Sequence, residues 1–134
     1  MVSALGDVPS IQEPDFAAVV SRPPGEPAEL RLTGIADSSS APALDELVAQ
    51  LHGVLVAEGA RAVVVDLRAL EFMSALAFNA LVGWLGKVNE LAAEQRYQIR
   101  FRCHPELPWQ RRSLKTLSCF ATDLVTLERD RGPA

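Results

Sequence analysis

Cysteine and histidine, which most often build disulfides and metal sites, are scarce in this chain. Cys103 and Cys119 are its only cysteines, too few for the disulfide framework of a small secreted domain or for a zinc site without other ligands. His52 and His104 fit no metal-ligand spacing. We therefore expect two reduced thiols in apolar surroundings and no metal.

Glycine-rich loops and long apolar runs are missing as well. The eight glycines are scattered and form neither a GxGxxG nor a GxxxxGK(S/T) motif, so we expect no nucleotide or other cofactor. No run approaches the roughly 20 apolar residues that span a bilayer, which argues against membrane insertion. A formal net charge of −4 argues against nucleic acid as a partner, because proteins bind its phosphates with basic side chains.

The length of 134 residues suits a single domain. Residues 1–14 contain Asp7 and Glu13 and lack the basic start and apolar stretch of a secretory signal, so we expect a cytoplasmic protein. Their mixture of Gly, Pro and small polar residues predicts a flexible N-terminal segment, and 129–134 a flexible tail. The domain is expected at residues 15–128.

Hydrophobic periodicity predicts strands that alternate with helices. Two short strands are followed by helices with apolar residues at helical spacing, and a β-branched run at Val63–Val65 is typical of a strand buried on both faces. The order β-β-α-β-α-β-α-β predicts an α/β fold: a mostly parallel, mixed sheet with right-handed crossovers and helices packed on its face. The strands are expected at residues 16–20, 28–32, 62–67, 97–103 and 124–127, and the helices from about residue 42, at 75–93 and at 108–120, with Ser38, Ser39 or Ser40 capping the first.

No arrangement of side chains points to catalysis. A nucleophile needs a base within hydrogen-bond reach, and the one pair worth considering is Cys103 with His104. Neighbouring residues of a strand point to opposite faces, so this pair is not expected to react together. We expect a protein without enzymatic activity.

The most informative segment runs from Asp66 to Leu81, where a buried strand ends and a helix begins. It resembles the signature of the STAS family, the fold of anti-sigma-factor antagonists, which typically reads D-L-S-G-V-x-F-I-D-S-S-G-L-x-x-L. The chain follows this pattern without a gap and keeps its Asp66, Leu67, Phe72 and Leu81. Upstream, residues 32–37 resemble the G-x-L-D corner after the second strand of the family. The resemblance covers about residues 16–128.

The resemblance implies a partner-switching module. In such families the first serine of D-S-S-G is phosphorylated by a kinase that is also the binding partner, and the added charge breaks the complex. Here Ser74 stands at the aspartate position and Ala75 at the phosphoacceptor, while Leu76 and Ala77 replace the next Ser and Gly. The usual switch is therefore expected to be lost. Ser74 is expected to cap the helix, with a displaced phosphoacceptor as the alternative.

Two surfaces are candidates for the partner. The apolar arc of the 75–93 helix centres on Ala77, Leu81, Trp84, Val88 and Leu91, and its flank is either a docking patch or covered by another helix. Asp37 is either the surface aspartate of the family or a turn-closing residue. The predicted partner-binding residues are Asp37, Ser38, Ser74, Ala75, Leu76, Phe78, Asn79 and Val82.

The second candidate surface is Trp109, Arg111 and Arg112, residue types enriched in binding hot spots, unless Trp109 folds back on the core.

Two functions fit these features. The first is a non-enzymatic adaptor in a bacterial signalling or multiprotein complex, with a kinase-like anti-sigma factor or another signalling protein as partner. The second is a STAS component of a membrane transport assembly, with a transporter subunit as partner. A homodimer is compatible with either function.

Overall fold

The computed structural model describes residues 8, 10–22, 25–104, 106–120 and 125–129, with the backbone alone described for 118–120 and 126–129. The side chain of Cys119 and the outermost parts of the two expected flexible ends therefore lie outside the described residues. The strands are β1 (Ile11–Gln12), β2 (Phe16–Ser21), β3 (Ala28–Ala36), β4 (Ala62–Met73), β5 (Gln98–Cys103) and β6 (Val125–Arg129), and the helices are α1 (Ala41–Glu58), α2 (Ala75–Asn89) and α3 (Pro108–Phe120), with short 3-10 turns η2 (Ser38–Ser40) and η3 (Ala93–Gln95).

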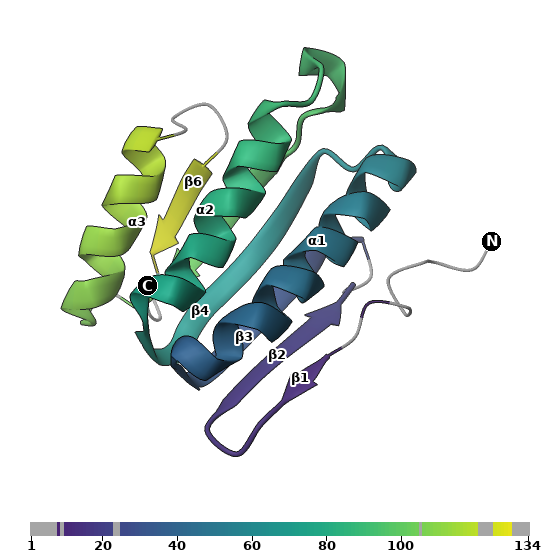
Figure 1. The fold of residues 1–134 in the computed structure, drawn as a ribbon. Helices are drawn as coiled ribbons and strands as arrows, with labels where there is room; N and C mark the ends of the chain where they lie inside the picture. The colour runs from purple at the N-terminus through teal and green to yellow at the C-terminus, as the bar shows by residue number, and fades with distance from the viewer. Residues whose placement is uncertain (1–7, 9, 23–24, 105, 121–124, 130–134) are drawn as a thin grey trace.

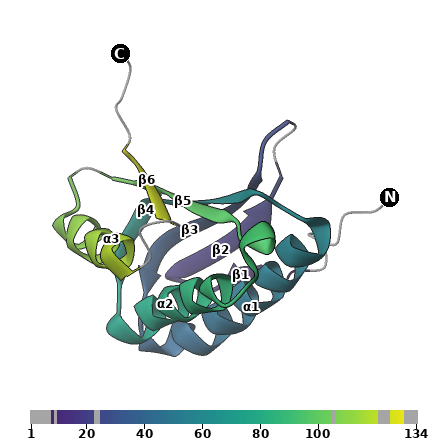
Figure 2. The ribbon, with the colours of Figure 1, turned by 90° about the horizontal axis from the view of Figure 1, so that it is seen from above.

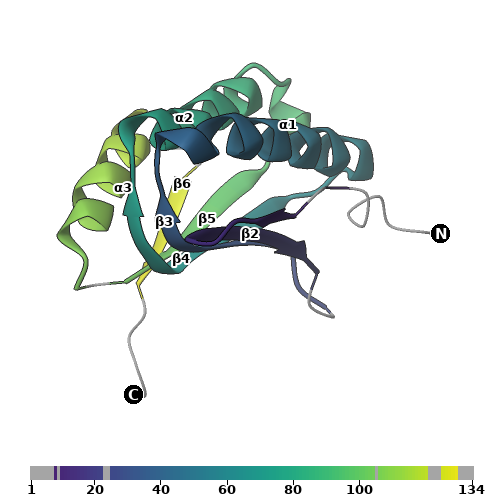
Figure 3. The same cartoon turned by 60° about the horizontal axis from the view of Figure 1, so that its bottom comes forward.

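The strands form one mixed sheet in the order β1-β2-β3-β4-β5-β6. β1 and β2 are antiparallel to their neighbours, whereas β3 to β6 are parallel. Each new parallel strand is added on the same side of the last one, so right-handed crossovers place the connecting helices on a single face. Figures 1 and 3 show α1 and α2 lying across that face, and Figure 2 shows α3 at the edge formed by β6.

The core lies between this helical layer and the sheet. The apolar arc predicted for α2 faces the sheet, since Ala77, Leu81, Trp84 and Val88 are buried. Leu91 lies beyond the end of α2 and is only partly buried against the core. From the sheet side, the residues that alternate along β4 from Val63 are buried beneath the helices, as a strand at the centre of the sheet requires.

The other face of the central strands is covered by side chains. No helix in the described part of the chain lies over it (Figure 3), yet Val64 is only 4% exposed. Its neighbours in register are Glu29 on β3 and Arg100 on β5. Long charged side chains can cover apolar surface with their stems while their charged ends stay in water. This arrangement explains the burial of Val64.

The structured part of the chain begins earlier than we expected. Residues 11–12 form β1, paired with β2, although we placed residues 1–14 in a flexible segment. Val8 and Ile11 are buried in the core, and this burial accounts for the ordering of the segment. The predicted helix 75–93 ends at Asn89, and η3 follows it. The largest difference concerns β4, which continues to Met73 instead of ending at Leu67.

Candidate protein-binding edge

The candidate site lies where β3 and β4 end side by side. Ala36 and Met73 are partners in register, and the Ser74 N–H donates to the Ala36 carbonyl oxygen at 2.8 Å. Because the strands are parallel, the chain leaves both at the same edge of the sheet. Asp37, the residue after β3, therefore stands beside Ser74, the residue after β4. We call this region, from Asp37 to Ser40 and from Ser74 to Asn79, the β3–β4 edge.

Asp37 closes the turn on one side of this edge. Its carboxylate accepts hydrogen bonds from the Ser39 N–H at 3.0 Å and the Ser39 hydroxyl at 2.5 Å, and it caps η2. These bonds, the hydroxyl one first, lower the pKa of Asp37. The predicted serine cap is replaced by this arrangement, because η2 precedes α1 and Ser40 makes no capping bond with its side chain. The Ser40 hydroxyl instead donates to Glu13 at 2.7 Å.

Ser74 begins α2 on the other side of the edge. Its hydroxyl oxygen accepts the Ala77 N–H at 3.2 Å, which confirms the predicted N-cap. Ala75 and Leu76 follow in the first turn and are exposed. The side chain of Leu76 is 57% exposed, more than any other large hydrophobic residue in the described ranges. The first turn of α2 therefore presents apolar atoms to solvent.

The remaining predicted residues differ in exposure. Ser38 and Asn79 are exposed, whereas Phe78 and Val82 are half-buried and pack against the core. A shallow hollow of about 250 Å³ lies between α1 and α2, lined by Ala41, Pro42, Asp45, Leu76, Asn79 and Ala80. The exposed residues of the edge are therefore Asp37, Ser38, Ser39, Ala75, Leu76 and Asn79, and the expected apolar flank of α2 contributes less to it.

Two β-bulges in β4 lead into this edge. Between Asp66 and Ala69, β4 uses one residue more than β3 does between Arg31 and Thr33, and the same happens between Leu70 and Phe72. Each bulge adds a residue to the outer face, so Phe72 points outward and is 49% exposed. Its register partner Ile35 is 42% exposed. Neither residue was among those predicted for the site.

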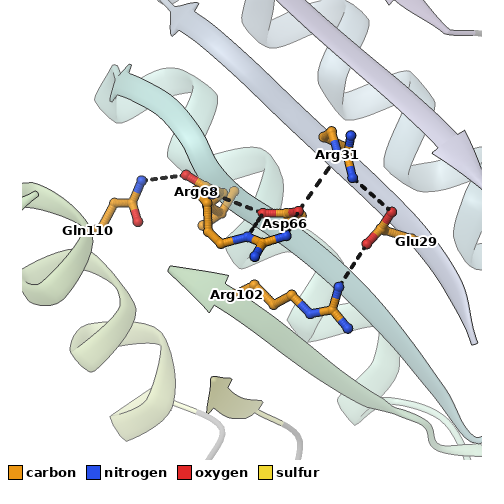
Figure 4. Close-up of polar contacts among 7 residues, drawn as sticks. Glu29, Arg31, Asp66, Arg68, Arg102 and Gln110 are labelled. Carbon is orange, nitrogen blue, oxygen red and sulfur yellow. Dashed lines mark hydrogen bonds and ion pairs between the residues drawn. The ribbon is translucent and has the colours of Figure 1, made fainter. Parts of the chain in front are cut away.

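Side chains from the first turn of α3 donate hydrogen bonds to the carbonyl oxygens of the bulged stretch of β4. β5 pairs with β4 only as far as Asp66, so beyond that point no strand in the described part of the chain bonds this side of β4. The fully buried Gln110 donates through Nε2 to the carbonyl oxygens of Leu67 at 2.6 Å and Leu70 at 2.9 Å, and accepts the His104 N–H at 2.8 Å. Figure 4 shows this side chain reaching β4 from α3.

The predicted second patch starts in this turn. The indole N–H of Trp109 donates to the Glu71 carbonyl oxygen at 2.8 Å, and the ring is half-buried against the core. Arg111 and Arg112 are exposed. Of the three residues, Trp109 therefore has a structural role in shaping the stretch that leads to Ser74.

The aspartate of the motif belongs to an ion-pair cluster on the outer face. Asp66, 3% exposed, accepts two bonds from the Arg68 guanidinium at 3.0 and 2.9 Å, and Arg31 approaches it at 3.7 Å (Figure 4). Arg31 and Arg102 also pair with Glu29. Burial alone would raise the pKa of Asp66, but the Arg68 bonds and the two positive charges lower it. Asp66 is thus held as a structural carboxylate.

The two histidines are engaged in hydrogen bonds away from the edge residues. His52 Nδ1 lies 2.6 Å from the Tyr97 hydroxyl, which also accepts the Trp84 indole N–H at 2.7 Å. His104 Nδ1 accepts the Glu106 N–H at 3.1 Å. In the portion of the chain that the structure describes, no three His, Cys, Asp or Glu side chains gather as a metal site. None of the helices in that portion is long and apolar enough to cross a membrane.

Comparison with known proteins supports the fold assignment. No protein-family model matches the sequence, and no curated protein sequence matches it. A crystal structure of an anti-sigma factor antagonist from Mycobacterium paratuberculosis is similar, with a TM-score of 0.57 and 23% sequence identity over 87% of this chain and 90% of that one. The chain therefore has the fold of an anti-sigma factor antagonist, the STAS fold that residues 66–81 led us to expect.

Proposed function

We propose that this protein is an adaptor of the anti-sigma-factor antagonist type that binds another protein through the β3–β4 edge, without catalysis and without phosphorylation at the usual position. The observation that carries the proposal is the exposure of Ala75 and Leu76 in the first turn of α2. The partner we expect is a kinase-like anti-sigma factor or another subunit of a bacterial signalling complex, in the cytoplasm.

The chemistry of the first turn supports a permanent contact. The resemblance to the STAS signature puts Ala75 at the phosphoacceptor position, and an alanine has no hydroxyl to receive a phosphate. The neighbouring hydroxyl of Ser74 already caps α2. An apolar side chain such as Leu76 adds to a protein interface by leaving water, and Ala75 cannot take up the phosphate charge that would reverse the contact.

The absence of catalysis is supported by the state of the titratable groups. His52 is bonded to Tyr97 inside the fold, and His104 accepts a backbone N–H through Nδ1. Asp37 and Asp66 both have lowered pKa values, which suits permanent carboxylates and not general acids. Each of these groups takes part in a hydrogen bond or ion pair within the fold.

Affinity capture from the organism that carries the gene tests the proposal. The full-length chain, tagged, is compared with Ala75→Glu and with Ala92→Glu, the same change at an exposed residue beyond the far end of α2. We expect one partner to be recovered with the wild type and with Ala92→Glu and to be depleted with Ala75→Glu. Equal recovery with all three baits would place the interface elsewhere, and a transporter subunit as partner would favour a transport assembly.

Phosphopeptide mass spectrometry of the protein purified from the same cells tests the loss of the switch. We expect the peptide that contains Ser74 and Ala75 to be unmodified, because the Ser74 hydroxyl is occupied as a helix cap and Ala75 has none. Incubation with ATP and the captured partner should leave it unmodified as well. Stoichiometric phosphate on Ser74 would show that the acceptor has moved by one residue.

A further inference from the structure

Exposed apolar side chains gather around the β3–β4 edge. Within the described ranges, four large hydrophobic residues are substantially exposed: Val19, Ile35, Phe72 and Leu76. Three of them belong to the ends of β3 and β4 and the first turn of α2. Phe72 and Leu76 lie two residues on either side of Ser74, and Ile35 is the register partner of Phe72. Exposed apolar residues that gather in this way mark interaction sites.

The position of Ile35 is fixed by the chain that crosses it. Gly34 has a φ of +88°, and a Cβ there would overlap the Asp15 carbonyl oxygen. That oxygen accepts the Ile35 N–H at 2.7 Å. The turn between β1 and β2 is therefore held directly against the end of β3, and it brings Asp15 next to Ile35.

A hollow with acidic walls is lined by Ile35 and by Glu71, the residue before Phe72. It has a volume of about 350 Å³, and Glu13, Asp15, Ile35 and Glu71 are among the residues that line it. No lysine or arginine is among its lining residues in the described part of the chain. Glu13, Asp15 and Glu71 are all exposed, and the Glu13 carboxylate also accepts a bond from the Ser40 hydroxyl. The hollow thus offers negative charge next to exposed apolar atoms.

We propose that the docking surface extends from Leu76 around the β3–β4 edge to Phe72, Ile35 and this hollow, and that its occupant is a protein segment with an apolar side chain flanked by lysine or arginine. The inference rests on the proposed function and adds the chemistry of the partner. The apolar side chain packs on Phe72 and Ile35, and a flanking cation faces Asp15 and Glu71. An acidic segment would meet these carboxylates with like charge, which disfavours it.

Photo-crosslinking in the native cell tests the extent of the surface. p-Benzoylphenylalanine, a photoreactive phenylalanine analogue, is placed at position 72, 76 or 19 of the full-length chain. Val19 is the matched control because it is 40% exposed on β2 and its register partner Arg31 lies four residues before Ile35, roughly 13 Å along β3. We expect positions 72 and 76 to crosslink to one partner and position 19 to give no adduct with it.

The sequence of the crosslinked peptide and the Kd values of variants for the purified partner test the proposed chemistry of the partner. We expect the peptide attached at position 72 to contain an apolar residue next to Lys or Arg. With the purified partner, Phe72→Ser should raise Kd about tenfold. Glu71→Gln should raise it about threefold at low salt and hardly at all at about 0.5 M salt, because salt screens exposed charges. Val19→Ser should leave Kd unchanged.

The outcomes separate this inference from the proposed function. Crosslinking at position 76 alone, or a loss of affinity with Ala75→Glu but none with Phe72→Ser, would overturn the extended surface and leave the adaptor function standing. An acidic peptide at position 72 would overturn the charge argument. No adduct at either position, or no effect of either substitution on affinity, would overturn both proposals.

Discussion

Along one side of β4, side chains of α3 donate hydrogen bonds to backbone carbonyl oxygens, as a neighbouring strand otherwise would. Among the described residues, no strand pairs with the β5 side of β4 beyond Asp66, and a buried carbonyl without a hydrogen bond costs free energy. Gln110 and Trp109 supply donors to three carbonyl oxygens of this stretch, those of Leu67, Leu70 and Glu71. The stretch leads directly into Ser74, so the geometry of the β3–β4 edge depends on side chains of α3.

Removal of the Gln110 amide should therefore be costly. Gln110→Leu keeps a similar volume but leaves two carbonyl oxygens and the His104 N–H without their partner. We expect the free energy of unfolding to fall by about 3 kcal/mol, measured by urea denaturation. The control Arg112→Leu, at an exposed position of the same helix, should change it by less than about 0.5 kcal/mol. A Gln110→Leu variant as stable as the wild type would contradict the role of this side chain.

His52 should make stability depend on pH. The Tyr97 hydroxyl accepts a bond from Trp84, so its own proton is available to Nδ1 of a neutral His52. Burial lowers the pKa of His52 below the ordinary value of 6.5, and the charge of Lys87 lowers it further. The unfolded chain therefore binds the proton more readily. The contribution of neutral His52 to the free energy of unfolding is complete above pH 6.5, the pKa in the unfolded chain, and is lost as the pH falls below that value.

The comparison of the wild type with His52→Gln measures this contribution. Glutamine can still accept the Tyr97 proton but does not titrate. Between pH 7.5 and about pH 5 the wild type should lose more free energy of unfolding than the variant, followed by urea denaturation with tryptophan fluorescence. Parallel losses in the two proteins would show that His52 is not the responsible group.

At the scale of the elements, the sequence predicted those parts whose apolar residues recur with a regular period. The buried residues of α1 and α2 recur at helical spacing, so both helices and the face of α2 that meets the sheet were predicted. The end of β4 was not predicted, because two bulges break the two-residue alternation of a strand. The signal was present in the sequence: the apolar residues of β4 that belong to the core beneath the helices lie at 63, 65, 67, 70 and 73, so their spacing changes from two to three.

The exposure of Phe72 and Ile35 could not be predicted from the spacing of apolar residues alone. Phe72 turns outward because of the second bulge, and Ile35 follows a glycine with positive φ. Nothing local in the sequence pairs Gln110 with Leu67 or Asp15 with Gly34, since these contacts join residues far apart in the chain. By contrast, the N-cap at Ser74 depends on neighbouring residues, and it was predicted.

The close approach at Gly34 gives a test at this scale. Gly34→Ala places a Cβ against the Asp15 carbonyl oxygen and forces a side chain into the left-handed region, so we expect a loss of at least about 2 kcal/mol in the free energy of unfolding. Gly53→Ala is the matched control: Gly53 lies in α1, where a Cβ meets nothing within 4 Å, and the change should stabilise by up to about 1 kcal/mol. The two effects are measured as changes in Tm and in the free energy of unfolding by urea denaturation. Equal effects would contradict the close approach of Gly34 to the Asp15 carbonyl oxygen.

In the whole molecule, the packed faces of the sheet are separate from the β3–β4 edge, where we propose that a partner binds. The helices cover one face of the sheet, and an ion-pair cluster of Glu29, Arg31, Asp66, Arg68 and Arg102 occupies the other. The ends of β3 and β4 present apolar side chains with carboxylates around them. Because the central strands are packed on both faces, we expect the proposed contact at this edge to need little rearrangement, which favours tight binding.

The affinity of the captured partner for Ala75→Glu tests the central claim most directly. An acidic residue in the first turn of α2 is favoured by the helix dipole, so the variant should melt within about 2 °C of the wild type. By isothermal titration calorimetry we expect its Kd to be raised about tenfold or more, because a charge then lies in the desolvated contact, whereas Ala92→Glu binds like the wild type. If Ala75→Glu melts like the wild type and binds its partner equally well, the interface lies away from the β3–β4 edge and the account is wrong.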